Sequence, residues 1–539
     1  MRGLSVILRS QLARDRWVLS FWLGGIGLLG ISVAAAITTQ FADDAERTVI
    51  IQIAAANPAF LFLRGLPDGI NLGAVAFFQG FAFTSVLAGL MSTFLVVRHT
   101  RADEEAGRAE LLGATPIARS TMLAATLVLG TLANLTLVAL LSLAYIGGGL
   151  DAGGSLVSAL AVGAVGMVFV GVAAVVAQLM PSGRAANGVA SALVIGAYLL
   201  RGIGDALGTP SDDLLSATPS AISWLSPIGW GQATRPYTEP TLLPLLLSIT
   251  VFLVLAGASI AVRSRRDLGS SLVPERSGRA SARFGGRSVL GLAWRLQRAT
   301  VLGWVAGVIV LGAIAGGLGP VVAEAVAEND TLAGLIGSLV PGSTADTADV
   351  FIAALLGIGG VLAAAAGVQA MLRLRAEEVE GRAELLLATP VSRVRWMGET
   401  ALVAMASVLI VTTALGVATG GVLARSSGDG AELVRYTGAA LAHAPAALVF
   451  VAIAALAFAL VPRITIALGW GLLVIGLFLG QFGELLQLPE WLQALSPFFH
   501  SSAVPVVEFD VVSAGILLAV TVFGLALAMI ALRRRDLTA

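Results

Sequence analysis

The sequence of 539 residues contains no cysteine and no lysine, so all 33 basic residues are arginine. Without cysteine, disulfides, thiolate metal sites and cysteine nucleophiles are excluded. Without lysine, the chain cannot carry a Walker A loop, because that phosphate-binding motif requires one. The three histidines, His99, His443 and His500, lie far apart in the sequence, so a zinc or proton-relay cluster is not expected.

Charged residues are also scarce. They make up 12% of the chain, against about 25% in an ordinary soluble domain. Hydrophobic residues make up 57%, and the mean hydropathy is +0.90. A soluble globule cannot hide that much apolar surface, so the composition predicts an all-α, multi-pass membrane protein. Disorder, a coiled coil and a disulfide-rich secreted scaffold are excluded by the same figures.

Apolar segments long enough to span a bilayer recur along the chain. A spanning helix needs about 20 mostly apolar residues. Twelve segments qualify: 18–39, 72–97, 121–146, 155–180, 188–207, 241–262, 301–320, 349–372, 397–424, 438–461, 464–484 and 511–532. The first is interpreted as an uncleaved span, because its apolar run exceeds the about 7–15 residues of a signal-peptide core.

The distribution of arginine orients these spans, because cytoplasmic loops of membrane proteins are enriched in basic residues. If the N-terminus lies inside, the inner segments hold 27 arginines and the outer segments hold six. We therefore expect both termini to lie in the cytosol.

One segment of the chain occurs twice. Residues 101–119 read RADEEAGRAELLGATPIAR and residues 375–393 read RAEEVEGRAELLLATPVSR, with 13 of 19 positions identical. Shorter echoes are RRDL at 265–268 and 534–537, LSP at 225–227 and 495–497, and Trp22 with Trp304. The repeats predict two homologous halves of six spans, 1–270 and 287–539, joined by a cytosolic linker at 271–286. Because six is even, both halves have the same orientation and both repeated segments lie in the cytosol.

The repeated segment suits a short charged helix over 102–112. Glu104 precedes Arg108 by four residues, the favourable order for an ion pair on a helix, and the second copy repeats this spacing. The central glycine of each copy, Gly107 or Gly381, would cost about 1 kcal/mol against alanine, which a close approach to another surface would explain. A Thr-Pro pair follows in both copies and is typical of a helix start.

This segment has two interpretations. A solvated connector that merely turns the chain is one. Two matching copies on one side of the membrane favour the other, a docking site for two copies of one cytosolic partner.

A basic amphipathic helix is expected at the membrane interface before the first span of each half. Its basic residues in the first half are Arg2, Arg9 and Arg16, and Arg287, Arg295 and Arg298 repeat them in the second. A simple positive anchor would explain these residues equally well.

An entry helix, two spans and an acidic loop of the form E-x-x-G-x-x-E-L-L-x-x-T-P resemble the membrane subunit of ABC-2 type exporters. The chain is similar to tetronasin-type (polyketide antibiotic) exporter permeases in three features: the fused twelve-span form, the sequence from Arg98 to Leu112 and the sequence Asn57-Pro58-Ala59. The resemblance implies two parallel six-helix ABC-2 repeats, each with an N-terminal interfacial helix and a cytosolic coupling helix that fits a groove on a separate ATPase subunit.

By this resemblance each coupling helix would contact one of two ATPase copies. The coupling residues would be Glu104, Glu105, Gly107, Arg108, Glu110 and Thr115 in the first copy and Glu378, Gly381, Arg382, Glu384 and Thr389 in the second. The partner ATPase would bind ATP and Mg, and this chain would hold no cofactor or metal and catalyse no reaction. Val379 and Leu387 replace Glu105 and Gly113 of the first copy, so equal coupling by the two sites is not implied.

The predicted spans contain almost no ionisable side chains, which fits energy supplied from outside the membrane and an apolar or amphipathic substrate. In the resembled family the path runs between the halves, which implies these lining residues: Trp22, Phe77, Phe78, Gln79, Phe81, Thr84, Trp304 and Gln369. Ordinary packing is the alternative for the phenylalanines. The resemblance implies export of a polyketide antibiotic, another drug-like compound or a lipid across a bacterial plasma membrane, with no nucleic-acid partner.

Two other functions stay open. A twelve-span ion-coupled secondary transporter also has two parallel six-span repeats, but it normally keeps intramembrane carboxylates, histidines or arginines. A membrane enzyme would need a constellation of acid, base or metal ligands that the sequence does not show.

Overall fold

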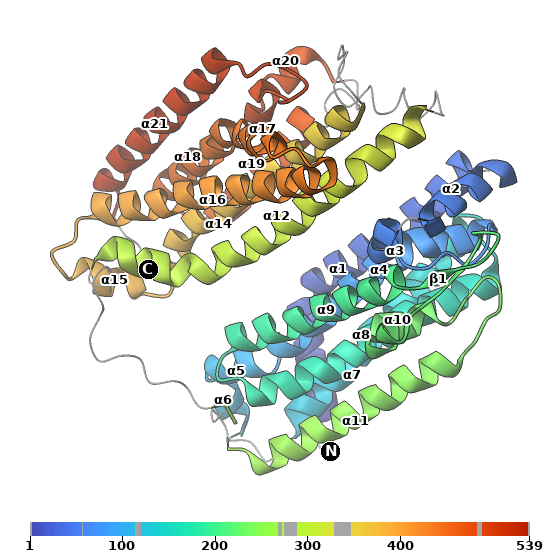
Figure 1. Ribbon diagram of the computed structural model, residues 1–539. Helices are drawn as coiled ribbons and strands as arrows, with labels where there is room; N and C mark the ends of the chain where they lie inside the picture. Colours follow the sequence, from blue (N-terminus) through green and yellow to red (C-terminus); the bar gives the residue numbers. More distant parts are fainter. Residues whose placement is uncertain are drawn as a thin grey trace. The chain divides into compact units, whose positions relative to one another are not determined.

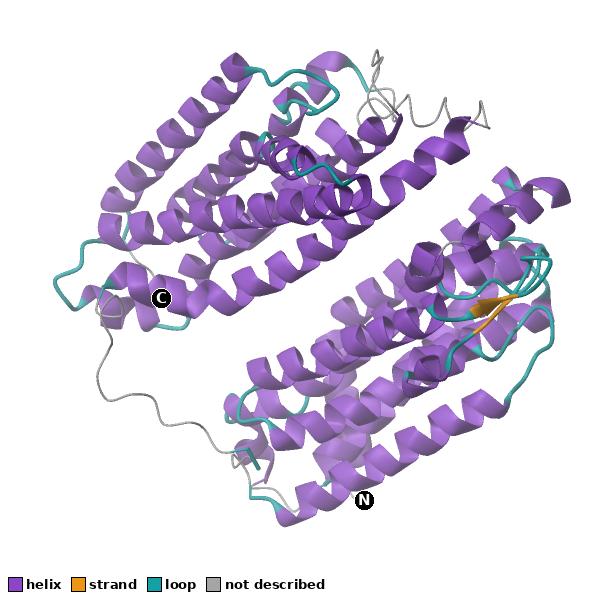
Figure 2. Ribbon diagram, viewed as in Figure 1, coloured by secondary structure: helices purple, strands orange, loops and turns teal. Residues whose placement is uncertain are grey.

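The computed structural model describes residues 3–41, 43–56, 58–113, 118, 120–267, 272–273, 288–327, 347–481 and 488–536. The chain divides into two compact units, Met1–Ser277 and Gly278–Ala539. Both units consist almost entirely of helices (Figures 1 and 2). The division falls inside the segment 271–286 that the sequence predicts as a linker.

Among its described residues, the first unit contains six helices long and apolar enough to cross a membrane. They are α1 (Leu4–Gln40), α4 (Leu72–Arg98), α7 (Thr121–Gly147), α8 (Ala152–Leu179), α9 (Gly183–Ala206) and α11 (Leu243–Arg265). The shorter elements are α2 (Asp44–Ala56), α3 (Pro58–Arg64), α5 (Arg101–Glu105), α6 (Arg108–Gly113), η1 (Ala221–Leu225), α10 (Pro227–Gln232) and the antiparallel pair β1 (Thr209–Pro210) and β2 (Ala217–Thr218).

The second unit follows the same plan. Its long helices are α12 (Val289–Ala327), α14 (Thr347–Val379), α16 (Arg393–Ser427), α17 (Ala431–Leu441) running on to α18 (Ala444–Leu460), and α21 (Val511–Arg534). The others are α15 (Arg382–Leu387), α19 (Thr465–Gln481), α20 (Glu490–Gln493) and η2 (Pro497–His500).

Eleven helices of the described chain meet the length and hydropathy expected of a span, against twelve predicted. The difference is α19, which covers most of the predicted span 464–484. Its 17 residues rise about 26 Å, slightly less than the about 30 Å of a bilayer core. The last predicted residues, 482–484, lie outside the described part of the chain.

Polar side chains cap the N-terminal ends of several long helices: each accepts a hydrogen bond from a backbone N–H of the first turn. The residues that do so are Asn71 before α4, Asp151 before α8, Ser182 before α9, Ser392 before α16 and Asp510 before α21. Such caps each contribute about 1 kcal/mol and fix where a span starts.

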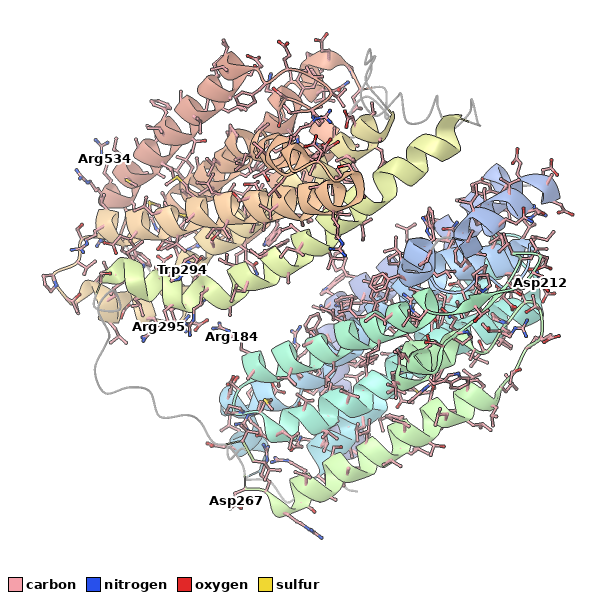
Figure 3. All side chains as sticks on the ribbon, viewed as in Figure 1. Arg184, Asp212, Asp267, Trp294, Arg295 and Arg534 are labelled. Atoms are coloured by element: carbon pink, nitrogen blue, oxygen red, sulfur yellow. The ribbon has the colours of Figure 1, made fainter. Side chains whose placement is uncertain are left out.

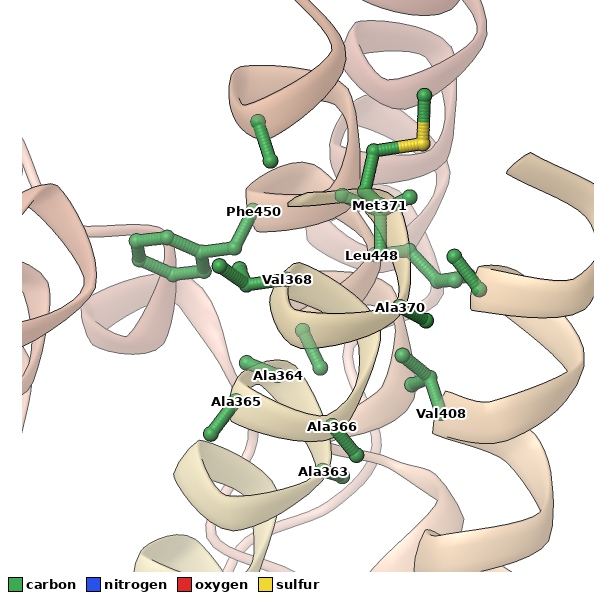
Figure 4. Close-up of a cluster of buried hydrophobic side chains, with 14 of the residues drawn as sticks. Ala363, Ala364, Ala365, Ala366, Val368, Ala370, Met371, Val408, Leu448 and Phe450 are labelled. Atoms are coloured by element: carbon green, nitrogen blue, oxygen red, sulfur yellow. The ribbon is translucent and has the colours of Figure 1, made fainter. Parts of the chain in front are cut away.

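Each unit buries its second and fourth spans most deeply. In the first unit these are α4 and α8, whereas α1 and α11 are the most exposed. In the second unit α14 and α17–α18 are central, and α12 and α21 are exposed. Small side chains allow the central helices to pack closely: Figure 4 shows Ala363–Ala366 of α14 packed with Val408 and Phe450.

The expected interfacial entry helix is not a separate element in the first unit. It continues into the first span as α1, a single helix of 37 residues. Ile7, Gln11, Asp15 and Leu19, four residues apart, form its buried stripe. The entry segment therefore packs along its own unit, and α12 is a continuous helix in the same way.

Candidate functional site

The repeated segment follows the second span in both units and breaks at its glycine. In the first unit α5 and α6 flank Gly107, and in the second the end of α14 and α15 flank Gly381. Both glycines have a φ of 71°, in the left-handed region that favours glycine. An added Cβ would meet nothing within 4 Å at either. The glycines therefore allow a turn, and the predicted continuous helix is not formed.

The carboxylate of Glu104 faces the interior of the first unit and does not pair with Arg108. Its side chain is only 6% exposed. Arg101 Nη1 donates to Oε2 at 2.9 Å, and Arg266 Nη2 donates to Oε1 at 2.6 Å. Arg263 Nη1 lies 3.1 Å from Oε1. Glu104 thus joins the repeated segment to the end of α11.

Glu378 is held in the same way in the second unit. Its side chain is 3% exposed and accepts a hydrogen bond from Arg375 Nη1 at 3.1 Å. It also pairs with Arg535, the residue after α21. The predicted partner Arg382 pairs instead with Glu380.

We call these two groups the loop clamps. The first consists of Arg101, Glu104 and Arg266, and the second of Arg375, Glu378 and Arg535. In each unit the clamp ties the loop to the residue that follows the last span. Figure 1 shows both last spans ending beside the loop of their own unit, and Figure 3 labels the neighbouring residues Asp267 and Arg534.

The arginine after the last span also contacts the fourth span of its unit. Arg266 Nη1 donates to the Gln178 carbonyl at 3.2 Å, and Arg535 Nη1 donates to the Phe458 carbonyl at 2.7 Å. Burial lowers the pKa of the Arg266 guanidinium from its usual value, and the neighbouring Glu104 carboxylate opposes this shift. Three segments of each unit therefore meet at one arginine.

The first unit ties its loop to α1 as well. Asp103, buried in the loop, accepts hydrogen bonds from Arg14 Nη2 at 2.6 Å and from Arg108 Nη1 at 2.7 Å. Arg14 also donates to His99 Nδ1 at 2.8 Å, so His99 Nε2 carries the proton and donates to Asp15 at 2.8 Å. This second tie joins the loop to the entry segment.

In the second unit the corresponding contacts of the loop lie within α14 and reach α16. Glu377, four residues after Arg373, pairs with it at 3.1 Å and accepts a hydrogen bond from Trp396 Nε1 of α16 at 3.3 Å. Gln297 of α12 is buried, and neither of its amide atoms has a hydrogen-bond partner. It stands seven residues before Trp304, as Asp15 stands before Trp22.

The remaining predicted coupling residues differ between the copies. Glu105 accepts a hydrogen bond from the Gly183 N–H at the start of α9, at 3.0 Å, whereas its replacement Val379 is exposed. Thr389 donates to the Leu386 carbonyl and closes α15; it does not begin α16, which Ser392 caps. Thr115, like Asn57, lies outside the described residues.

Most of the predicted path residues of α4 are buried inside the first unit. Phe77 stacks on Phe81 at a centroid distance of 4.5 Å, and Phe78 and Thr84 are buried beside them. Packing within the unit accounts for Phe78, Phe81 and Thr84, whereas Phe77 also lines a cavity. Gln79 is partly buried.

The tryptophans of the first span in each unit remain partly exposed. Trp22 contacts Phe94, with ring centroids 6.1 Å apart. Trp304 Nε1 donates to Oε1 of Gln369 at 2.7 Å, and Gln369 is exposed on a helix that is otherwise mostly buried.

A cavity of about 420 Å³ lies in the first unit at the far end of α4 from the loop. Phe77, Trp224 and Tyr237 line it, with the Asp68–Arg235 ion pair at 2.6 Å. Burial raises the pKa of Tyr237 to about 12, so its hydroxyl stays neutral beside Ser155. The volume falls within the usual range for small-molecule pockets. Among the described residues, no three His, Asp or Glu side chains cluster as metal ligands.

The comparisons with known proteins agree with a transport function. The family model described as "Multidrug efflux system permease Rv1217c, C-terminal domain" matches residues 287–533. The chain is also 34% identical, over 539 aligned residues, to the multidrug efflux system permease protein Rv1217c of Mycobacterium tuberculosis (strain ATCC 25618 / H37Rv). That alignment covers 99% of this chain and 95% of the relative. The chain belongs to this permease family.

Within this permease, the outer edge of each loop is apolar and acidic. Leu111 and Leu385 occupy matching positions and are each 76% exposed. Glu110 and Glu384, next to them, are also exposed. The clamps hold the opposite side of the loops against the units, so the two edges are accessible to another protein, as are other exposed residues of the loops such as Arg108 and Arg382.

Sequence reasoning missed the clamp arginines of this permease. Arg266 and Arg535 are the second arginines of the two RRDL sequences, and that echo was the available signal. The repeat does not reveal which carboxylate pairs with each arginine, because Glu104 lies 162 residues before Arg266 in the sequence.

Proposed function

We propose that this permease is the membrane subunit of an ATP-driven exporter and that a separate ATPase subunit docks on each of its two loops. The observation that carries the proposal is the pair of matching exposed edges, Leu111 with Glu110 and Leu385 with Glu384. Two equivalent surfaces fit two copies of one partner. The partner would bind ATP and Mg, since this chain lacks the lysine of a Walker A loop.

The substrate that we propose is a hydrophobic or amphipathic compound, drug-like or lipid-like, moved out of the cytoplasm. The scarcity of ionisable residues in the spans supports this class, as does the multidrug efflux named for the relative. The aromatic cavity of the first unit supports it too. Among the path residues, Gln369 is exposed and Trp22, Gln79 and Trp304 are partly exposed, so these side chains are accessible to such a compound.

We also propose that the loops and both termini lie on the cytosolic side of a bacterial plasma membrane. The excess of arginine in the segments on that side supports this orientation.

The test is co-purification of the permease with the neighbouring ATPase, followed by mass measurement of the intact complex in detergent. We expect one permease with two ATPase copies. Leu111→Arg together with Leu385→Arg should weaken ATPase binding by at least about tenfold, because a buried leucine at the centre of an interface would be replaced by a charge.

The matched control places the same substitution on the exposed leucines Leu207 and Leu495 at the far ends of the two units, and should leave binding unchanged. Unchanged co-purification of the loop variant would refute docking at these edges. Transport that survives ATP depletion but stops with the proton gradient would instead identify an ion-coupled transporter.

A further inference from the structure

The last span of each unit packs against few other elements of that unit. Among the described elements, α11 packs mainly on α8, and α21 packs mainly on α18. Both last spans are also among the most exposed long helices of their units. At the loop end of the unit, the clamp adds a charged connection between the last span and the loop.

The two clamps are chemically equivalent although they are separate in the sequence. In each, a nearly buried glutamate accepts from the arginine three residues before it and from the arginine after the last span. The latter arginine also donates to a carbonyl at the C-terminal end of α8 or α18. The same three-segment junction therefore occurs twice in one chain, which a chance surface contact would not explain.

We propose that the loop clamps transmit the movement of a docked ATPase to the last spans, α11 and α21, and to the helices on which these pack. The inference rests on the proposed function. Glu104, Arg266, Glu378 and Arg535 are then positioning residues: they contact neither ATP nor substrate, and they act by keeping loop and span together. The exposed edges bind the partner, and the clamps on the opposite side carry the movement.

The two loops differ in the ties that they have besides the clamps. The first loop has further ties, through Asp103 to Arg14 of α1 and through Glu105 to the start of α9. In the second loop, Glu377 bonds within α14 and to Trp396, and Val379 replaces the capping glutamate. Arg393, at the start of α16, also donates to the Arg535 carbonyl, so each loop keeps connections to its unit besides the ion pairs of its clamp.

The experiment replaces the second clamp by a covalent link. Because the chain contains no cysteine, Glu378→Cys with Arg535→Cys introduces the only thiols of the permease. The purified variant is divided, one part is bridged with a bis-methanethiosulfonate reagent, and both parts are then reconstituted with the ATPase. ATPase binding, ATP hydrolysis and transport are measured on each.

We expect the unbridged variant to bind the ATPase normally but to transport at least about fivefold less substrate per ATP, the lower end of usual coupling between sites. The bridge should restore transport, and its reduction should abolish the recovery. Recovery by a link that restores no charge distinguishes mechanical connection from a merely structural ion pair. Arg395→Cys with Glu399→Cys, an ion pair within α16, is the matched control and should respond to neither step.

Unchanged transport per ATP in the unbridged variant, or failure of the bridge to restore it, would overturn the inference. Loss of ATPase binding in that variant would also overturn it, because the clamp would then only shape the docking edge. Failure of the unmodified permease to bind any ATPase would refute the proposed function instead. If the double cysteine variant does not fold, Arg535→Lys, which keeps the charge but loses the forked donor geometry, is measured by the same assays.

Discussion

At the scale of single residues, the two loop glycines show how a repeated residue is misread from sequence. Spacing placed Gly107 and Gly381 inside a helix, where glycine is costly, and suggested a close approach. The structure shows open space beside both and a φ of 71°. Helical periodicity could not indicate this, because a single left-handed residue changes the direction of the chain without altering the pattern of its neighbours.

Gly381→Ala should loosen α15 because alanine in the left-handed region costs about 1–2 kcal/mol. We expect hydrogen exchange of the α15 amides to rise about fivefold or more. Gly381→Asn should be closer to the original, since asparagine tolerates this conformation. Gly438→Ala is the control: it also meets nothing within 4 Å but is helical, so it should not destabilise α17. Equal exchange in the alanine and original proteins would contradict the backbone explanation.

At the scale of elements, hydropathy located the spans because the bilayer imposes both length and composition on them. Eleven of the twelve predicted segments correspond to long apolar helices, and the twelfth to the shorter α19. Ion pairs could not be located in this way. The i,i+4 spacing of Glu104 and Arg108 favours a pair within one continuous helix, but the helix breaks at Gly107 between them. The folded unit instead brings Arg266 to the Glu104 carboxylate.

The same limit applies to close packing between elements. Tyr237, in the loop before α11, inserts its ring between the ends of α4 and α8. A Cβ on Gly73 or Gly154 would lie about 2.2 Å or 2.1 Å from that ring, so the two glycines make room for it. Nothing in the sequence separates these glycines from the many that meet nothing.

Gly73→Ala should therefore lower the thermal midpoint in detergent, because overpacking at this position costs about 1–3 kcal/mol of folding free energy. In a Tyr237→Ala background the same substitution should cost little, so the two effects are not additive. Gly196→Ala in α9, where a Cβ meets nothing within 4 Å, serves as the control. Additive losses in the double variant would show that the ring is not the obstacle.

At the scale of the whole molecule, the sequence repeat predicted two similar halves, and the structure contains two units of similar helix order. Besides differing in several short elements, the units differ in the ties of their loops. These differences were visible as single replacements, Val379 for Glu105 and Gln297 for Asp15, but their meaning depends on which side chains the fold brings together.

The orientation of the molecule can be tested with single cysteines, since the chain has none of its own. Leu207→Cys, exposed at the far end of the first unit, should react with a membrane-impermeant maleimide on right-side-out cells. Leu111→Cys, on the loop, should react only after permeabilisation. The reverse pattern would place the termini outside and contradict the arginine distribution.

All three residues of each clamp come from the same half of the chain. The first clamp is complete before residue 267, and the second contains nothing from before residue 375. A gene encoding one half alone would therefore already specify the connection between its loop and its last span. A pair of such products would then contain two of these connections, one in each copy. Duplication and fusion would then add no new connection of this kind; they would free each copy to gain or lose the additional ties that now distinguish the two loops.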